Sequence, residues 1–149
     1  MVIRRALFAD APAINRLMQD SSAYRGEYSA ILQGYSVSPE QLAADGMYVL
    51  ETDTEILGFY SLTNSNDCPE LDLMFVANNA QGKRIGAMLF EHMKQQAAAL
   101  GAAQVKIIAH PPAEAFYLRM GAIKVGVKPP SGRVTWTRPV LSLALQSTA

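Results

Sequence analysis

The sequence predicts one α/β domain of the α+β kind, built on a mixed sheet, and three observations carry this prediction. Residues 69–101 join an apolar run to an amphipathic helix through a short polar turn. An apolar strand at 104–109 follows, and the helical crossover between the two strands makes them parallel neighbours. Two β-prone runs at 47–51 and 56–63 flank a polar turn and form a hairpin. The length suits a single domain over residues 1–149.

The beginning of the chain is expected to contain one strand and two helices. Residues 2–5 are β-prone, and a helix is expected at about 11–23 with Asp10 as its N-cap. A second, short helix should end near residue 45, because Ser38–Gln41 has the pattern of a capping box with proline at the first helical position.

The segment between these two helices has no regular hydrophobic period. Three tyrosines, Tyr24, Tyr28 and Tyr35, alternate there with glycine and serine residues. Two interpretations stay open: the tyrosines line a substrate pocket, or they pack an irregular loop against the core.

The second half contains the long helix up to Leu100 with Gly101 after it, a two-turn helix at 113–120, and strands at 123–127 and 134–145. The last strand carries Pro139 and is therefore expected at a sheet edge or a bulge. The element order is β-α-α-β-β-β-α-β-α-β-β, which is typical of a mixed sheet covered by helices.

Composition excludes several classes of function. Thirteen basic and thirteen acidic residues give zero net charge, so neither a nucleic-acid nor a membrane-surface partner is indicated. No apolar run approaches the ~18 residues of a membrane span. Cys68 is the single cysteine, which excludes an internal disulfide. We therefore expect a cytoplasmic protein.

The turn before the long helix is the candidate ligand site. The residues from Gln81 to Ala87 combine small and basic side chains at the point where a strand gives way to a helix. Unpaired N–H groups and the positive end of the helix dipole meet there, and both favour an anion such as a phosphate.

Two sequence motifs together resemble the GNAT acyltransferase superfamily. Residues Gln81–Ala87 are similar to its motif Q/R-x-x-G-x-G/A, and His110–Gly121 are similar to its second signature, N-x-x-A-x-x-F-Y-x-x-x-G-F. The resemblance implies a mostly antiparallel central sheet with a parallel, splayed pair of fourth and fifth strands and about four helices. It also implies acetyl-CoA as cosubstrate, bound where those two strands separate.

The resemblance also implies which residues bind acetyl-CoA. The backbone of the fourth strand would pair with the pantetheine arm, and the backbone of the following turn would hold the pyrophosphate. The cofactor-binding residues implied are Met74, Phe75, Val76, Gln81, Gly82, Lys83, Arg84, Ile85, Gly86, Ala87 and His110.

Three positions depart from the family pattern. Arg84 replaces a family glycine; a helical φ does not require glycine, so the turn is expected to form, with the Cβ changing how closely the phosphates approach. His110 replaces the family asparagine, and its alternative role is structural. Ala122 replaces the final aromatic residue of the second signature.

Acetyl transfer to an amine needs a protonated acid for the leaving thiolate, and can use a base for the amine. Tyr117 occupies the position that protonates the thiolate in many members of the family; its alternative role is to anchor the short helix. Glu70 is the candidate base, and Asp72, two residues on, would share its strand face near the substrate. Both carboxylates have a plain surface role as the alternative, and many members work through water alone. His92 is expected to be a surface or partly buried residue of the long helix.

The sequence therefore favours an N-acetyltransferase that acetylates a primary amine of a small metabolite. A protein or peptide acetyltransferase is one alternative, supported by Glu70 alone. A non-catalytic acyl-CoA-binding domain is the other, kept open by Arg84 and His110. No metal is expected, and a homodimer is the expected assembly.

Overall fold

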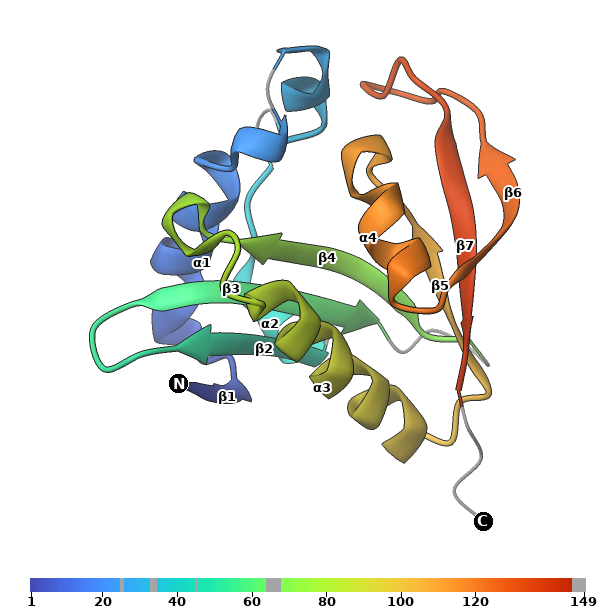
Figure 1. Ribbon diagram of the computed structural model, residues 1–149. Coiled ribbons are helices and arrows are strands. Elements are labelled where there is room, and N and C mark those ends of the chain that lie inside the picture. Colours follow the sequence, from blue (N-terminus) through green and yellow to red (C-terminus); the bar gives the residue numbers. More distant parts are fainter. Residues whose placement is uncertain (25, 33–34, 45, 64–67, 146–149) are drawn as a thin grey trace.

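One mixed sheet organises the molecule (Figure 1). The computed structural model describes residues 1–24, 26–32, 35–44, 46–63 and 68–145. Within these residues the strands are β1 (Val2–Arg5), β2 (Gly46–Glu51), β3 (Ile56–Thr63), β4 (Glu70–Val76), β5 (Gln104–Ile108), β6 (Ile123–Lys128) and β7 (Arg138–Ala144). They lie in the order β1-β2-β3-β4-β5-β7-β6, and β4–β5 is the parallel pair among them. The predicted fold class is confirmed.

Helices cover both faces of this sheet. The α-helices of the described residues are α1 (Ala11–Gln19), α2 (Pro39–Ala44), α3 (Ile85–Ala99) and α4 (Glu114–Arg119). The two sheet faces bury separate cores: Phe59 packs with residues of α1 and α2, whereas its neighbour Tyr60 packs with residues of α3 and α4. Adjacent strand residues point to opposite faces, so β3 contributes to both cores.

The first helix is shorter than predicted. It ends at Gln19 rather than near residue 23, and the short 3-10 helices η2 (Ser22–Tyr24) and η3 (Gly26–Leu32) follow it. Asp10 occupies the predicted N-cap position, but its side chain makes no capping bond to α1. Its carboxylate instead accepts hydrogen bonds from the Arg4 guanidinium at 2.8 and 3.0 Å and from the Leu7 N–H at 2.7 Å.

The second helix begins as predicted. The Ser38 Oγ accepts a hydrogen bond from the Gln41 N–H at 3.1 Å, as an N-cap does. The Gln41 side chain bonds the Tyr35 hydroxyl instead of completing a capping box. The helix is described up to Ala44, and its predicted end near residue 45 lies outside the described residues.

The last strand differs from its prediction in length and place. It begins at Arg138, whereas Val134 forms only an isolated bridge with Ser131. It lies between β5 and β6, so Pro139 is not on an edge strand. The β5 ladder ends at the pair Ile108–Val140, so the missing N–H of Pro139 falls beyond it, while its carbonyl accepts from Ala109 at 2.9 Å.

The parallel pair β4–β5 separates almost at once. One residue pair, Glu70 with Lys106, joins the two strands, together with a hydrogen bond from the Lys106 N–H to the Pro69 carbonyl at 3.0 Å. On its other side, β4 pairs with β3 from Glu70 to Val76. The edge of β4 that faces β5 is therefore open for most of its length, as the diverging strands in Figure 1 show.

Candidate active site

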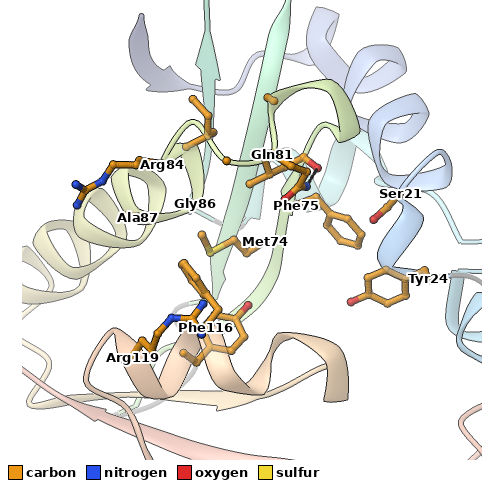
Figure 2. Close-up of a pocket in the computed structure, with 15 residues that line it drawn as sticks. Ser21, Tyr24, Met74, Phe75, Gln81, Arg84, Gly86, Ala87, Phe116 and Arg119 are labelled. Atoms are coloured by element: carbon orange, nitrogen blue, oxygen red, sulfur yellow. Dashed lines mark hydrogen bonds between the residues drawn. The ribbon is translucent and has the colours of Figure 1, made fainter.

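A cavity of about 500 Å³ lies at the open edge of β4 (Figure 2). Its walls come from four parts of the chain: the end of β4, the turn into α3, the helix α4, and the segment before η3. The lining residues are Ser21, Tyr24, Met74, Phe75, Val76, Ala80, Gln81, Gly82, Arg84, Ile85, Gly86, Ala87, Phe116, Tyr117 and Arg119. Most residues that the sequence motifs singled out for the cofactor are thus brought together.

The turn into α3 has an unexpected backbone conformation. Arg84 has φ +62° and ψ +21°, which is the left-handed region, and not the helical φ expected from the sequence. Gly82 has a positive φ as well, +82°. A side chain in the left-handed region is strained, because Cβ approaches the carbonyl oxygen. The family glycine at position 84 therefore has a conformational reason, and in this chain arginine adopts the same conformation at a cost.

The first turn of α3 presents free donors to this cavity. The Arg84 side chain does not cap the helix, and the Met88 N–H already bonds the Arg84 carbonyl at 3.1 Å. The N–H groups of Ile85, Gly86 and Ala87 precede this first helical bond and have no carbonyl partner within the helix. Together with the helix dipole they form an anion-binding end. In Figure 2 the Arg84 side chain extends away from Tyr24 and Ser21.

Gly86 lets α4 approach this helix end. A Cβ added at Gly86 would lie 3.4 Å from two ring atoms of Phe116, which is a tight contact. Phe116 belongs to α4, and its ring packs edge-on against Phe90 of α3. This packing fixes α4, and with it Tyr117, opposite the end of β4.

Two tyrosines, Tyr24 of η2 and Tyr117 of α4, line the cavity. Tyr117 is buried, and burial raises its pKa to about 12. Desolvation also raises the pKa of Tyr24 well above its ordinary value, with a further increase from Tyr117 and a partial decrease from Arg138. Both hydroxyls are consequently protonated at neutral pH.

Hydrogen bonds from Asn78 hold the segment that carries Tyr24. The Asn78 amide donates to the Asp20 carbonyl at 2.7 Å, and its oxygen accepts from the Ser22 N–H at 3.0 Å. The Tyr24 ring then stacks on Phe75, with centroids 5.1 Å apart. No periodicity signals these contacts, which is why the sequence left the role of Tyr24 open.

A second cavity of about 240 Å³ adjoins the first and shares Tyr24 and Phe75 with it. Its lining residues are Tyr24, Ile31, Leu32, Tyr35, Asp72, Leu73, Phe75, Ile108, His110 and Arg138. The candidate pocket residues Tyr35 and Asp72 lie here, and so does His110, which was expected at the cofactor. The His110 ring stacks on the Tyr24 ring, with ring centroids 3.8 Å apart.

Three predicted site residues line neither cavity. Lys83 is exposed on the turn, and Glu70 lies at the paired start of β4, where its backbone bonds Thr63. Tyr28 packs edge-on against His110 and Trp136, each at 4.8 Å, which fits the loop-packing interpretation. The roles of Lys83 and Glu70 stay predictions.

Other lining residues were missed by the sequence argument. Among them are Ser21, Phe116 and Arg119 in the first cavity and Arg138 in the second. Phe116 and Arg119 belong to the second motif, which was the available signal. Nothing in the sequence brings Ser21 to β4, because that approach depends on the Asn78 hydrogen bonds.

His92 of α3 is half-buried and lines neither cavity. Its Nδ1 lies 2.7 Å from the Tyr60 hydroxyl, and desolvation lowers its pKa. In the described part of the chain no group of three or more His, Cys, Asp and Glu side chains could hold a metal ion. Nor does any helix there have the length and apolarity to cross a membrane.

The fold and the site together define an acyltransferase-type architecture, and comparisons with known proteins identify the family. The model of the acetyltransferase (GNAT) domain matches residues 31–137, well over half of the chain. No curated protein matches the sequence. The chain belongs to the GNAT acetyltransferase family, and the resemblance stated from the two motifs is confirmed.

Solved structures share this fold at low sequence identity. A putative GNAT acetyltransferase from Desulfovibrio desulfuricans is 17% identical over 96% of this chain and 98% of that one, with a TM-score of 0.79. The PaiA N-acetyltransferase from Thermoplasma acidophilum, in complex with coenzyme A, is 18% identical over 96% and 98%, with a TM-score of 0.76. YncA, a putative acetyltransferase from Salmonella typhimurium with its cofactor acetyl-CoA, is 20% identical over 100% and 96%, with a TM-score of 0.76.

Proposed function

We propose that the protein transfers the acetyl group of acetyl-CoA to the primary amine of a small metabolite. The observation that carries this proposal is the first cavity, which extends from the uncapped start of α3 along the open edge of β4 to Tyr117. Acetyl-CoA carries a diphosphate, which matches the start of α3, and an arm with amide groups, which matches the open edge of β4.

The diphosphate would bind the backbone N–H groups of the turn and of Ile85 to Ala87. Arg84 lies in the same turn, but its side chain points outward, so the backbone is the main contact in this proposal. The amides of the pantetheine arm would pair with the free edge of β4 near Met74 and Val76, as an added strand does. The Val76 carbonyl accepts a bond from the Gln81 side chain at 3.1 Å, so Gln81 would have to release it or leave this carbonyl unused.

The thioester would then lie beside Tyr117. The free-base amine attacks the thioester carbonyl, the C–N bond forms, and the C–S bond breaks as the tetrahedral intermediate collapses. Tyr117 gives its proton to the leaving sulfur and regains one from the former amine nitrogen through water. A pKa of about 12 keeps Tyr117 protonated at the pH values at which the amine first loses its proton.

The second cavity is the proposed acceptor site. It meets the first at Tyr24 and Phe75, so an amine bound there would face the thioester. Its volume of about 240 Å³ lies below the ~300–1,000 Å³ of typical drug-sized sites, which supports a small acceptor. Glu70 lies outside both cavities, and a water-mediated proton path therefore replaces a dedicated base in this proposal.

Calorimetry and a thiol-release assay test the function. Acetyl-CoA should bind, and Ala87→Glu should weaken binding at least tenfold, because its carboxylate would compete with the diphosphate at the helix end. Gln95→Glu adds the same charge on an exposed position of the same helix and should leave binding unchanged. Failure of acetyl-CoA to bind at millimolar concentration would overturn the proposal.

The acceptor panel separates the alternatives. Turnover of small amines supports the proposed function, and turnover of peptides alone would indicate a peptide acetyltransferase. Binding of acetyl-CoA with no turnover on either class would indicate a non-catalytic acyl-CoA-binding domain. The expected homodimer and cytoplasmic location stay predictions.

A further inference from the structure

Two buried N–H donors near the start of β7 have no acceptor. They are the Nε1 of Trp136 and the Nε of Arg138, and neither has a hydrogen-bond partner in the part of the chain that the structure describes. A buried donor without an acceptor costs free energy, and native proteins contain few of them. The described residues therefore supply no acceptor to either donor.

Arg138 belongs to the second cavity. It lines that cavity together with Tyr24, Tyr35, Asp72 and His110. Its positive charge acts on the Tyr24 hydroxyl, whose pKa it lowers against the effect of burial. Arg138 and Tyr24 thus line one cavity, and Tyr24 also lines the cofactor cavity.

Trp136 lies at the edge of the same cluster of rings. Its ring packs edge-on against Tyr28, with ring centroids 4.8 Å apart. Tyr28 packs edge-on against His110 at the same centroid distance of 4.8 Å, and His110 stacks on Tyr24 with centroids 3.8 Å apart. This aromatic cluster (Tyr24, Tyr28, His110 and Trp136) reaches the second cavity through Tyr24 and His110, which line it together with Arg138. An ionic hydrogen bond is stronger in such surroundings than in water.

We propose that the acceptor is a small amine that also carries a carboxylate, as α-amino acids do, and that Arg138 binds this carboxylate. The proposal rests on the function proposed above and specifies its acceptor. A guanidinium presents N–H donors in a planar fork that matches the two oxygens of a carboxylate. Bound in this way, the carboxylate pairs with the guanidinium of a residue that lines the cavity.

The other polar groups of the cavity fit a zwitterion. Asp72 lines the same cavity from β4 and gives it a negative charge, which attracts an ammonium group before the amine is deprotonated. The remaining walls are mostly aromatic and aliphatic, among them Ile31, Leu32 and Phe75, and favour an apolar side chain. The cavity therefore combines both charges of an amino acid with an apolar surface.

Matched pairs of amines test the role of the carboxylate. L-leucine, L-methionine and L-phenylalanine are compared with their carboxamides by thiol release at saturating acetyl-CoA and at equal concentration of free-base amine. The carboxylate compounds should have a kcat/KM at least tenfold higher than their carboxamides, with the difference mainly in KM. Equal values for the two series would overturn the proposal.

Substitution of Arg138 tests the residue. Arg138→Met should raise KM for the carboxylate compounds at least tenfold, leave the carboxamides unchanged, and leave acetyl-CoA affinity and the unfolding temperature near those of the wild type. Arg138→Lys keeps the charge and should recover part of the loss. Lys124→Met removes an equal charge from the exposed strand β6 and should have no effect.

The outcomes separate this proposal from the general function. If acetyl-CoA binds but none of the carboxylate amines is acetylated, or Arg138→Met weakens both series equally, the carboxylate site is wrong and the cofactor site stands. If acetyl-CoA itself does not bind, the proposed function fails and the acceptor assignment fails with it.

Discussion

Arg84 shows what one backbone conformation does to a binding turn. Its φ of +62° lies in the region that glycine enters freely and that other residues enter at a cost of about 1–2 kcal/mol. In return its carbonyl accepts the first α3 hydrogen bond, from Met88. The strain is thus located where the helix presents its free N–H groups to the cavity.

Arg84→Gly should relieve this strain. Glycine also gains freedom in the unfolded chain, worth about 0.4–1 kcal/mol, so the net effect should be unchanged stability or a gain of up to about 1.5 kcal/mol. Lys83→Gly is the matched control, because Lys83 does not have a positive φ and glycine relieves no strain there. This variant should be less stable than the wild type by about 0.4–1 kcal/mol, since glycine only adds freedom to the unfolded chain. Urea unfolding of the two variants measures the contrast, and equal destabilisation by both would contradict the strain.

Tyr117→Phe should reduce kcat by about 10²- to 10⁴-fold, the usual contribution of a general acid. Phenylalanine keeps the packing against the rings of Phe90 and Phe116, so acetyl-CoA affinity and stability should change little. Steady-state kinetics on an identified amine, with calorimetry as the control, measures this. Full activity in the variant would show that Tyr117 is only structural.

The pH profile gives a second measurement on Tyr117. The wild-type rate should rise as the amine loses its proton and should not fall as pH passes through 10, because the acid form of Tyr117 persists until its pKa of about 12. A tyrosine with the ordinary pKa of about 10 would lose its proton there, and the rate would decline. A decline centred near pH 10 would therefore show that burial does not raise the pKa of Tyr117.

At the residue scale the sequence predicts contacts that belong to one motif and misses those that join distant segments. Gln81 to Ala87 form one turn, so their approach to a common cavity follows from local structure. Ser21 and Arg138 reach the two cavities from segments far apart in the chain, and only tertiary packing brings them there. The left-handed φ of Arg84 could not be predicted, because the chain offers arginine where the conformation favours glycine.

At the element scale, Gly58 sets how close α3 lies to the sheet. A Cβ at this position in β3 would lie 2.8 Å from Leu89 Cδ1 and 2.9 Å from the Phe75 carbonyl oxygen. Both distances are shorter than a methyl group tolerates, and Ile85, the first residue of α3, would lie 3.3 Å away. The helix end that faces the cavity is therefore positioned by the absence of a side chain below it.

Gly58→Ala should destabilise the fold by about 1–3 kcal/mol, as overpacking of a core does, and should weaken acetyl-CoA binding by shifting the start of α3. Gly126→Ala in the exposed strand β6 is the control, since an added Cβ meets nothing within 4 Å there. Thermal unfolding and calorimetry measure both effects. If Gly58→Ala were as stable as the wild type, α3 could move away from the sheet without a loss of stability.

Element prediction succeeded where one signal dominated. The hydrophobic period of α3 and the turn between β2 and β3 each have a local cause, and their predicted positions agree with the structure. Asp10 lies at the predicted N-cap position, but its carboxylate pairs with Arg4 of β1 instead of capping α1. The last strand was not at the sheet edge expected from Pro139, because the order of strands in a sheet depends on tertiary packing.

At the scale of the whole molecule, acetyl-CoA should stabilise the fold by mass action. At a concentration of 100 times Kd the gain is about 2.7 kcal/mol, which corresponds to a rise of about 5–10 °C in Tm for a chain of this size. Differential scanning calorimetry with and without acetyl-CoA measures it. Ala87→Glu at the same concentration should show a much smaller rise, and an equal rise would place the ligand elsewhere.

The single residue pair between Glu70 and Lys106 also bears on folding cooperativity. Strands β1 to β4 and strands β5 to β7 form two half-sheets with almost no backbone bond between them, so side chains of the α3 and α4 core provide most of the connection. Such halves can open locally before the whole domain unfolds. A cosubstrate bound along β4 would connect the two half-sheets. The protein with bound cosubstrate would then unfold as one cooperative unit, whereas in the free protein the two half-sheets would open separately.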